Sequence, residues 1–276
     1  MKINDRAIGH SEPCYIIAEC GANHLQDLGT ALEMIEMAAA AGADAVKVQH
    51  YFPEDAAGKD TDKLEFYMGT YMDWDWTEEL VRIAKLNDIT LFSTPASVMA
   101  VEYLERHDMP AYKIASCDSA NYELMLAIKK TGKPVILSTG MCEWDDIGTA
   151  LLVLPFETAV LHCNSAYPTP DRDANLNTLS HLVGSVFNPV GYSDHTIGYT
   201  IPLAAVARGA CIIEKHFYLE GTDPIDKEFS IDHLEFGEMV QGIRRIEEAI
   251  GEVRYGYTES EEACRWLKEL KSGGGE

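Results

Sequence analysis

Short apolar runs alternate with longer amphipathic stretches along almost the whole chain. Eight apolar runs have the length of buried strands, and they cover Tyr15–Glu19, Ala45–Gln49, Thr90–Ser93, Tyr112–Ser116, Val135–Thr139, Ala159–Cys163, Val190–Ser193 and Cys211–Lys215. Eight stretches have the apolar spacing of helices, and they cover Ala31–Ala41, Glu78–Leu86, Val98–Arg106, Tyr122–Lys130, Trp144–Leu152, Leu176–Val183, Ile201–Ala207 and Leu234–Ile250. Glycine or proline stands at most of the junctions, where helices end and the chain turns. The pattern predicts eight consecutive strand–helix units.

Strict alternation of strands and helices predicts a parallel sheet. Eight units favour a closed (β/α)8 TIM barrel of the α/β class over an open, doubly wound sheet. Runs such as CYIIAE and PVILST are apolar almost throughout, which is typical of strands covered on both faces. An open nucleotide-binding sheet would carry G-x-G-x-x-G after its first strand, whereas this chain has AECGANH there. We predict a single barrel domain over residues 1–252, then a helical extension over 253–276 with an unordered SGGGE tail.

The composition restricts the class of protein. With 46% hydrophobic and 24% charged residues, the 276-residue chain has the profile of a soluble globular protein. No apolar stretch approaches the ~20 residues that cross a membrane, and MKINDRAIGH does not resemble a secretion signal, so we expect a cytoplasmic location. A net charge of −23 argues against binding to nucleic acid or an anionic membrane. The seven cysteines include no C-x-x-C pair, so we expect reduced, mainly structural thiols.

Polar side chains end most of the apolar strands, which is where a TIM barrel carries its active site. The first four strands lead to Glu19, Asn23, His24, Lys47, Gln49, Ser93, Thr94, Lys113, Ser116 and Asp118. The last four lead to Ser138, Thr139, His162, Asn164, Ser165, Tyr167, Ser193, Asp194, His195, Glu214, Lys215 and His216. Because the strands of such a barrel are parallel, we expect all of these residues at the same end of the molecule.

Two lysines in this set indicate an anionic substrate. Lys47 and Lys113 suit a phosphate group, because each is a point charge and the hydroxyls nearby donate hydrogen bonds. Glu19 is suited to act as acid, base or water-orienting group. The set therefore predicts a phosphorylated substrate. Considered alone, Lys47 is explained as well by a side chain that extends outward from its strand.

Two histidines indicate a metal site. His195 and His216 end adjacent strands and suit a shared divalent cation, with Asp194 and Glu214 as hydrogen-bonding partners of the rings. A single histidine at a strand end is more often structural, so both interpretations stay open on this evidence. The aromatic run YMGTYMDWDW (Tyr67–Trp76) also has two interpretations, as a cover over a substrate pocket or as a loop packed on the rim or a subunit interface.

Eight segments add a family signal, in the order IIAECGANH, GADAVKVQ, LFSTPAS, PAYKIAS, TGKPVILSTGM, LHCNSAYPTP, PVGYSDHTIG and GACIIEKHF. Together they resemble the sialic acid synthase (N-acetylneuraminate synthase) family over about residues 15 to 230, essentially the whole barrel. Members of that family condense phosphoenolpyruvate with an aldehyde sugar, commonly N-acetylmannosamine, into a 2-keto-3-deoxy acid and phosphate. The resemblance implies a transferase that needs a divalent metal, Mn²⁺ first and Mg²⁺ or Co²⁺ as alternatives.

The resemblance also implies roles for individual residues. His195 and His216 would hold the metal. The phosphate and carboxylate of phosphoenolpyruvate would be surrounded by Lys47, Lys113, Ser116, Ser138 and Ser193, with Ser165 near them. Glu19 would lie between the two substrates. The sugar side would involve Gln49, Tyr167, Asp118 and Asp226. The residues that we expect to be catalytic are Glu19, Lys47, Lys113 and Asp118.

Three features depart from the family pattern. The family usually has Gly-Glu after the serine of the fourth strand, where this chain has Cys117-Asp118. A glycine-containing turn usually follows Asn-His, where this chain has Leu25-Gln26-Asp27. Typical members also carry an antifreeze-protein-like domain that brings a sugar-binding arginine to a partner subunit. We expect a barrel without that domain, and a homodimer formed by the barrels is possible.

Other functions stay open on the sequence. A related synthase would use another aldehyde, such as an acetamido-dideoxy sugar or an unmodified hexose. A lysine Schiff-base aldolase is a more distant alternative. The barrel would alternatively be a catalytically weak module that binds a sugar or a partner protein, although the five polar residues Glu19, Lys47, Lys113, His195 and His216 argue against this.

Overall fold

An eight-stranded parallel barrel forms the centre of the computed structural model, which describes residues 1–58 and 60–272. Its strands are β3 (Tyr15–Glu19), β4 (Ala45–His50), β5 (Thr90–Pro95), β6 (Tyr112–Ile114), β7 (Val135–Ser138), β8 (Thr158–Cys163), β9 (Val190–Asp194) and β10 (Ile212–Tyr218). Consecutive strands pair in parallel, and β10 pairs with both β9 and β3, which closes the barrel. The predicted TIM barrel is confirmed.

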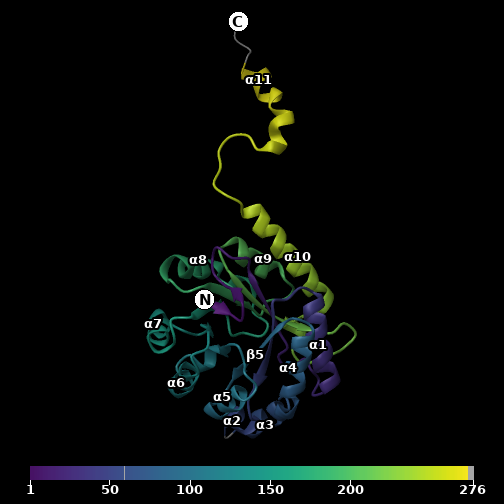
Figure 1. Cartoon of the computed structure of the whole chain (residues 1–276), viewed down its shortest axis with the longest axis vertical. Coiled ribbons are helices and arrows are strands. Elements are labelled where there is room, and N and C mark those ends of the chain that lie inside the picture. Colours follow the sequence, from purple (N-terminus) through teal and green to yellow (C-terminus); the bar gives the residue numbers. More distant parts are fainter. Residues whose placement is uncertain (59, 273–276) are drawn as a thin grey trace.

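Helices surround the barrel on its outside (Figure 1). Those that follow the barrel strands are α1 (Leu28–Ala40), α4 (Thr77–Leu86), α5 (Val98–Glu105), α6 (Tyr122–Thr131), α7 (Trp144–Val153), α8 (Leu176–Ser185), α9 (Thr200–Ala207) and α10 (His233–Ile250). Each lies where the apolar spacing predicted a helix. Side-chain caps define several starts: Asp27 accepts a hydrogen bond from Thr30 N at 2.7 Å, and Asp232 accepts one from Leu234 N at 2.9 Å.

Several short elements were not predicted. Strands β1 (Lys2–Ile3) and β2 (Arg6–Ala7) form an antiparallel hairpin, and Ile3 packs with the apolar residues inside the barrel. Helices α2 (Pro53–Ala57) and α3 (Thr61–Met68) stand in the long connection between β4 and α4. The strands and α2 are too short to show an apolar period, and α3 has no buried residue, so the pattern along the chain does not reveal them.

Six predicted strand ends were off by one to three residues, and two of these differences, in β6 and β10, matter for the site. Strand β6 stops at Ile114, before the predicted Ser116, because Ser116 begins a 3₁₀ turn, η2 (Ser116–Asp118). Strand β10 continues to Tyr218, past the predicted Lys215, because its last residues pair with the short strand β11 (Ile231–Asp232). Both differences lie at the carboxyl ends of the strands, where loops and turns shape the site.

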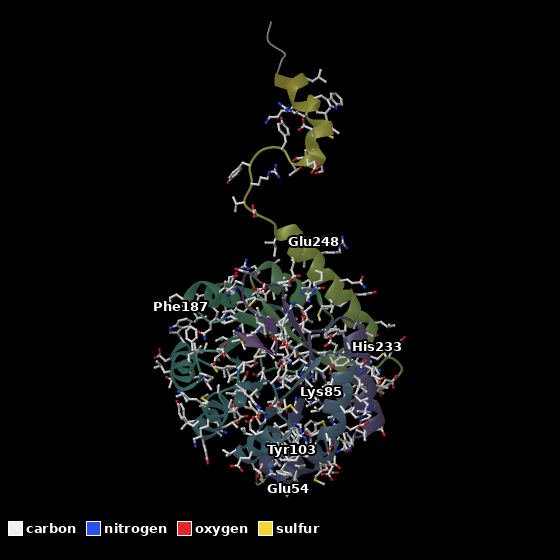
Figure 2. The ribbon with its side chains drawn as sticks, viewed as in Figure 1. Glu54, Lys85, Tyr103, Phe187, His233 and Glu248 are labelled. Carbon is white, nitrogen blue, oxygen red and sulfur yellow. The ribbon has the colours of Figure 1, made fainter. Side chains whose placement is uncertain are left out.

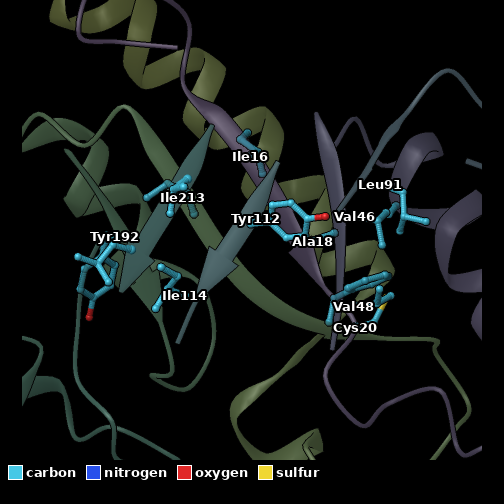
Figure 3. Packing of buried hydrophobic residues seen from close by; sticks show 14 of the residues in the cluster. Ile16, Ala18, Cys20, Val46, Val48, Leu91, Tyr112, Ile114, Tyr192 and Ile213 are labelled. Atoms are coloured by element: carbon cyan, nitrogen blue, oxygen red, sulfur yellow. The ribbon is translucent and has the colours of Figure 1, made fainter. Parts of the chain in front are cut away.

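The barrel interior is apolar towards the amino ends of the strands and charged towards their carboxyl ends. The apolar part consists of Ile3, Ile8, Tyr15, Ile17, Ala45, Phe92, Ala111, Ile136, Ala159, Leu161, Cys211 and Ile212. Alternate strand residues face the helices, as Ile16 of β3 and Val46 of β4 do (Figure 3). Because the side-chain period of a strand is two residues, Glu19 lies on the same inner face as Ile17. Inside the barrel, buried charged side chains such as Glu19 therefore lie directly above a layer of apolar side chains.

The chain continues beyond α10 as a segment that leads away from the barrel (Figure 1). It contains a 3₁₀ helix, η5 (Glu259–Cys264), and helix α11 (Trp266–Ser272), which lies where one more helix was predicted. We call residues 251–272 the C-terminal arm. The SGGGE tail that we expected to be unordered covers residues 272–276; Ser272 is the last residue of α11, and residues 273–276 lie outside the described residues. Within the described residues, no helix combines the length and the apolarity that a membrane span requires.

A buried ion pair joins β9 and β10 on the outer face of the barrel. Lys215 Nζ donates to Asp194 Oδ2 at 2.6 Å and to the carbonyl oxygen of Thr196 at 2.5 Å, and both charged side chains are fully buried. Burial lowers the pKa of Lys215 and raises that of Asp194 despite their attraction, so the desolvation cost exceeds what the pair recovers. The predicted role of Asp194 as a partner of a histidine ring is therefore wrong.

Removing one partner of this pair should lower the stability of the protein strongly, whereas replacing both partners should lower it little. We expect Lys215→Met to lower the free energy of unfolding by about 3–5 kcal/mol, because it leaves the Asp194 carboxylate buried without its counter-ion. The double variant Asp194→Asn/Lys215→Met should recover most of that loss. Urea unfolding followed by fluorescence measures both effects.

A matched control is Arg82→Met, which removes one partner of the exposed Arg82–Glu79 pair. This control should leave the unfolding midpoint unchanged, because exposed pairs contribute little. If Lys215→Met behaves like Arg82→Met, the buried pair does not hold β9 and β10 together.

Candidate active site

A cavity of about 400 Å³ opens at the carboxyl ends of the barrel strands. Of the 13 predicted site residues, 11 line it: Glu19, Lys47, Gln49, Lys113, Ser116, Ser138, Ser165, Tyr167, Ser193, His195 and His216. The two that do not are Asp118 and Asp226. The structure thus brings together residues from distant parts of the chain at the end of the barrel where the sequence predicted them.

Two lysines and two glutamates form the floor of this cavity. Lys47 Nζ lies 3.0 Å from Glu19 Oε2 and 3.7 Å from Glu214 Oε2. Lys113 Nζ lies 3.9 Å from Glu214 Oε1. We call these four residues the charged floor. All four side chains are at most 5% exposed, and their charges cancel when all are ionised.

Each lysine is also held by a hydroxyl. Lys47 donates to Thr94 Oγ1 at 3.1 Å, and Lys113 donates to Ser138 Oγ at 2.6 Å. Burial acts to lower the pKa of both lysines. The two neighbouring carboxylates outweigh this effect at Lys47 and raise its pKa, whereas the pKa of Lys113 stays lowered. Lys47 is therefore the more firmly protonated of the two.

The two carboxylates are oriented by neutral donors. Ser193 Oγ donates to Glu214 Oε1 at 2.9 Å, and Gln49 Nε2 donates to Glu19 Oε1 at 2.6 Å. Burial acts to raise the pKa of Glu214, but the two lysines outweigh burial and hold this pKa well below its usual range. Glu214 is therefore ionised at neutral pH. It faces the lysines and not a histidine ring, so its predicted role as a ring partner is wrong.

The two histidines lie side by side at one wall of the cavity, with ring centroids 5.5 Å apart. His195 Nδ1 donates to the carbonyl oxygen of Asn164 at 2.7 Å, which leaves the lone pair on Nε2. The Tyr167 ring packs against His195 at 4.1 Å. Burial lowers the pKa of His195 to about 3, so its ring is neutral. A neutral ring with one orienting hydrogen bond is the form that binds metals.

The partner of His216 is an aspartate that the sequence assigned only through the family resemblance. Asp226 Oδ2 lies 3.6 Å from His216 Nδ1 and accepts a hydrogen bond from Ala22 N at 2.9 Å. Gly21 makes room for this arrangement: a Cβ there would overlap Asp226 Oδ2 and lie 2.8 Å from His216 Nδ1. Its φ of +50° also favours glycine.

The histidine pair supplies two ligands at most. No group of three or more His, Cys, Asp or Glu side chains is arranged to hold a metal within residues 1–58 and 60–272. A divalent ion at His195 and His216 would therefore take its other ligands from water and substrate, which is typical of a catalytic site with open positions. His216 Nδ1 is buried and has no hydrogen-bond partner within the described structure, and the Asp226 carboxylate lies 3.6 Å from it.

Another part of the cavity wall carries hydroxyl and thiol groups packed around a glycine. Gly140 N donates to Ser116 Oγ at 2.9 Å, and Ser116 Oγ lies 3.2 Å from Cys163 Sγ. A Cβ on Gly140 would lie 3.0 Å from Ser116 Oγ and Cys163 Sγ and would overlap Ser165 Oγ. The backbone must therefore approach these groups closely, which lets three small polar side chains face the cavity.

The turn η2 directs Cys117, and not Asp118, towards the cavity. Cys117 is exposed and lines the cavity, whereas Asp118 accepts a hydrogen bond from Asn121 Nδ2 at 3.2 Å. Burial raises the pKa of Asp118. Its predicted catalytic role stays a prediction, since the carboxylate lies beside the cavity wall and not on it.

The aromatic run between Tyr67 and Trp76 is divided between the two predicted roles, a cover over the substrate pocket and a loop that packs on the barrel. Tyr67, at the end of α3, lines the cavity. Trp74, in the 3₁₀ helix η1 (Trp74–Trp76), instead stacks on Phe52 at 4.1 Å and packs against Tyr103 at 5.0 Å. Only the first part of the run therefore reaches the substrate space.

The sequence reasoning gave no place in the site to three lining residues, Ala115, Cys163 and Met141, and it expected Glu214 only as a partner of the histidine rings. The signal for Glu214 was present, because it stands two residues before His216 and shares its face of β10. The same period places Cys163 of β8 on the inner face with Leu161. No comparable signal exists for Met141, which reaches the cavity from the loop after β7 with a φ of +64°.

Comparison with known proteins agrees with this geometry. The model of the NeuB family matches residues 34–255, which is most of the barrel. The chain belongs to the NeuB family. An uncharacterised protein of Methanocaldococcus jannaschii is 43% identical over 91% of this chain and 76% of its own length. The pseudaminic acid synthase of Helicobacter pylori is 38% identical over 87% of this chain and 76% of its own length.

A solved structure extends the comparison to three dimensions. The N-acetylneuraminic acid synthetase of Leptospira borgpetersenii, in complex with citrate, superposes with a TM-score of 0.91 at 34% identity and covers 99% of this chain and 96% of its own. As a member of the NeuB family, the protein is an enzyme, a synthase of the sialic acid synthase type. The alternative of a barrel without catalytic activity is therefore rejected.

The ionised Glu214 of this NeuB-family synthase should make its stability depend on pH. Folding lowers the pKa of Glu214 from 4.5 to about 2. Its stabilising effect is thus fully present above pH 4.5 and is lost as the pH falls towards about 2. In urea titrations, we expect the wild type to exceed Glu214→Gln in free energy of unfolding by a constant amount at neutral pH. This difference should shrink below pH 4.5.

The matched control is Glu102→Gln on the exposed surface of α5. Its difference from the wild type should show no such decline. A Glu214→Gln variant whose difference from the wild type is independent of pH would mean that Glu214 is not ionised between the lysines.

Proposed function

We propose that this NeuB-family synthase condenses phosphoenolpyruvate with an aldehyde sugar, N-acetylmannosamine or a related acetamido sugar. The products would be a sialic-acid-like 2-keto-3-deoxy acid and phosphate. The observation that carries the proposal is the position of the charged floor beside His195 and His216 in one cavity. Lysine charges suit a phosphate, and neutral imidazoles suit a divalent ion, for which we propose Mn²⁺, with Mg²⁺ or Co²⁺ as alternatives. The predicted cytoplasmic location belongs to the same proposal.

The charge of the cavity supports a requirement for a divalent cation. The charged floor is neutral as a whole, and Asp226 adds negative charge beside His216. Phosphoenolpyruvate is an anion, and moving it into a desolvated neutral site without compensating charge is costly. A divalent ion held by His195 and His216 would supply that charge and, when bound, would polarise the aldehyde oxygen of the sugar.

The residues of the chain have separable tasks in the condensation. C3 of phosphoenolpyruvate forms a bond to the aldehyde carbon, whose oxygen takes up a proton, and a water molecule adds to C2. Glu19, held by Gln49 and Lys47, would orient this water and accept its proton. The C2–O bond to phosphate then breaks, and Lys47 and Lys113 would stabilise the departing phosphate. Substrates, water and products balance without an oxidant or reductant.

The sugar half of the proposal has two rivals. A synthase acting on another aldehyde would share the charged floor and differ only at the cavity mouth, where Tyr67, Cys117, Met141 and Tyr167 lie. A panel of acetamido sugars, acetamido-dideoxy sugars and hexoses separates these possibilities by rate. A lysine Schiff-base aldolase acting on pyruvate would release no phosphate, and borohydride would trap its covalent intermediate on a lysine.

Loss of one histidine should weaken metal binding and slow turnover. With Mn²⁺, phosphoenolpyruvate and N-acetylmannosamine, we expect His195→Ala to release phosphate at least about 100-fold more slowly than the wild type, because Lewis-acid stabilisation is worth several kcal/mol. Titration calorimetry should show weaker Mn²⁺ binding by the same variant. His181→Ala, a variant of an exposed histidine, is the control. Undiminished phosphate release by His195→Ala would exclude the assigned metal site.

The position of bond cleavage provides an independent test. With ¹⁸O in the oxygen that bridges C2 and phosphorus, we expect the label to leave with phosphate, because the proposed tetrahedral species expels phosphate by C–O cleavage. Mass spectrometry of both products measures this. Label retained in the keto acid would contradict the mechanism while leaving the synthase activity itself intact.

A further inference from the structure

Helix α3 lies at the edge of the barrel and contributes little to the apolar core. None of residues 61–68 is buried. The helix packs beside α2 (Figure 1), whose residue Glu54 lies at the outer edge of the molecule (Figure 2). Nevertheless, Tyr67 near the end of α3 lines the active-site cavity. Because no buried side chain of α3 fixes the helix, the position of Tyr67 depends on contacts around the end of the helix.

One of these contacts comes from Gln26, in the loop after β3. Its side-chain nitrogen Nε2 donates to the carbonyl oxygen of Met68 at 2.9 Å and to that of Tyr71 at 3.1 Å. Met68 is the last residue of α3 and follows Tyr67 directly. The last carbonyl groups of a helix have no partner within the helix and need one from outside. A side chain 42 residues away from Met68 in the sequence thus holds the end of α3 beside the cavity.

The turn that carries Gln26 is itself held on both sides. Leu25 and Gln26 have φ angles of +54° and +51°, which glycine adopts more readily than other residues do. Gln26 N donates to His24 Nδ1 at 3.0 Å, and burial lowers the pKa of His24 to about 4, so the neutral ring accepts this bond. Asp27 accepts a hydrogen bond from Thr30 N and caps α1. A side chain on so fixed a turn loses little freedom when it binds α3.

A second contact holds the same end of α3 from the loop after β4. Tyr51 OH and Thr70 Oγ1 share a hydrogen bond of 3.0 Å, and Thr70 Oγ1 also donates to the carbonyl oxygen of Phe66 at 3.0 Å. The rings of Tyr51 and Tyr67 pack edge to face, with centroids 5.5 Å apart. The loops after β3 and β4 together therefore set the position of the Tyr67 ring.

The position of Tyr67 suits a sugar better than phosphoenolpyruvate. Tyr67 lies at the cavity mouth, whereas Lys47 and Lys113 lie on the charged floor. The face of an aromatic ring carries partial negative charge, which disfavours an anion and favours the C–H groups of a sugar. We propose that Gln26 is a positioning residue that sets the affinity for the sugar acceptor by holding Tyr67 at the mouth. This inference rests on the proposed function.

An isosteric change at Gln26 tests this assignment. Gln26→Glu keeps the size of the side chain but replaces the donor by a carboxylate, which cannot donate to the two carbonyl oxygens. With Mn²⁺ and N-acetylmannosamine, or the sugar of the panel that reacts fastest, we expect the KM for the sugar to rise about fivefold or more. The reason is that a less populated position of Tyr67 lowers the apparent affinity. The KM for phosphoenolpyruvate and kcat should change by less than about twofold.

Two further variants separate the hydrogen bonds of Gln26 from other effects. Gln26→Lys restores a donor and should return the KM for the sugar to within about twofold of the wild type. Gln241→Glu makes the same chemical change at an exposed position of α10, away from α3 (Figure 1), and should change neither KM. An unchanged KM for the sugar in Gln26→Glu would overturn the proposal. So would an equal rise in both KM values, or a Gln26→Lys variant as impaired as Gln26→Glu.

Hydrogen exchange measured by mass spectrometry gives a result that does not depend on turnover. Amides of residues 61–71 should exchange at least about threefold faster in Gln26→Glu than in the wild type, because the end of α3 opens more often without its two hydrogen bonds. Gln26→Lys and Gln241→Glu should match the wild type. Equal exchange in the wild type and Gln26→Glu would show that Gln26 does not hold α3. If the wild type converts no sugar of the panel, the proposed function fails and with it the role in sugar affinity, while exchange still decides whether Gln26 holds α3.

Discussion

The structure depends on burying two lysines and two glutamates together at the carboxyl end of an otherwise apolar barrel. Lys47 and Lys113 face Glu19 and Glu214 across the inner surface of four strands, β3, β4, β6 and β10. Each charge would be expensive to bury alone, and together they are tolerated because every one lies near an opposite charge. The floor therefore holds only if all four strands are in their observed register, which ties the site to closure of the barrel.

The position of the charged floor depends most on strand β10, because this strand pairs with both β3 and β9 and so closes the barrel. Its inner face presents Glu214 and His216, one to the lysines and the other to the histidine wall. Its outer face presents Lys215, paired with Asp194 of β9. Charged groups thus fix the strand on both faces. Two hydrogen bonds offset part of the free energy that burying these charges costs. Ser193 donates one to Glu214, and Lys215 donates the other to the carbonyl oxygen of Thr196.

Two glycines allow the walls of the cavity to be built from polar groups. Gly21 lets Asp226 and His216 approach, and Gly140 lets Ser116, Cys163 and Ser165 gather around its backbone. A side chain at either position would push these groups apart. The neutral floor and the neutral His195 ring leave the cavity without excess positive charge, which is why an anionic substrate and a divalent ion are linked in the proposed function.

The apolar pattern along the chain predicted the main strands and helices, but it did not predict which charged side chains would pair. The sequence by itself determined the number, order and approximate bounds of the eight barrel strands and the eight helices that follow them. Burial of a strand or of one helix face leaves a periodic pattern of apolar residues along the chain, which can be read without the fold. It also determined that polar strand ends such as Lys47 and His195 would share one end of the barrel. Only the tertiary structure decided the partners: Glu214 with the lysines, Asp194 with Lys215, and Asp226 with His216. Those pairs depend on register and on which residue of a strand end faces inward, and a shift of a single residue reverses that direction.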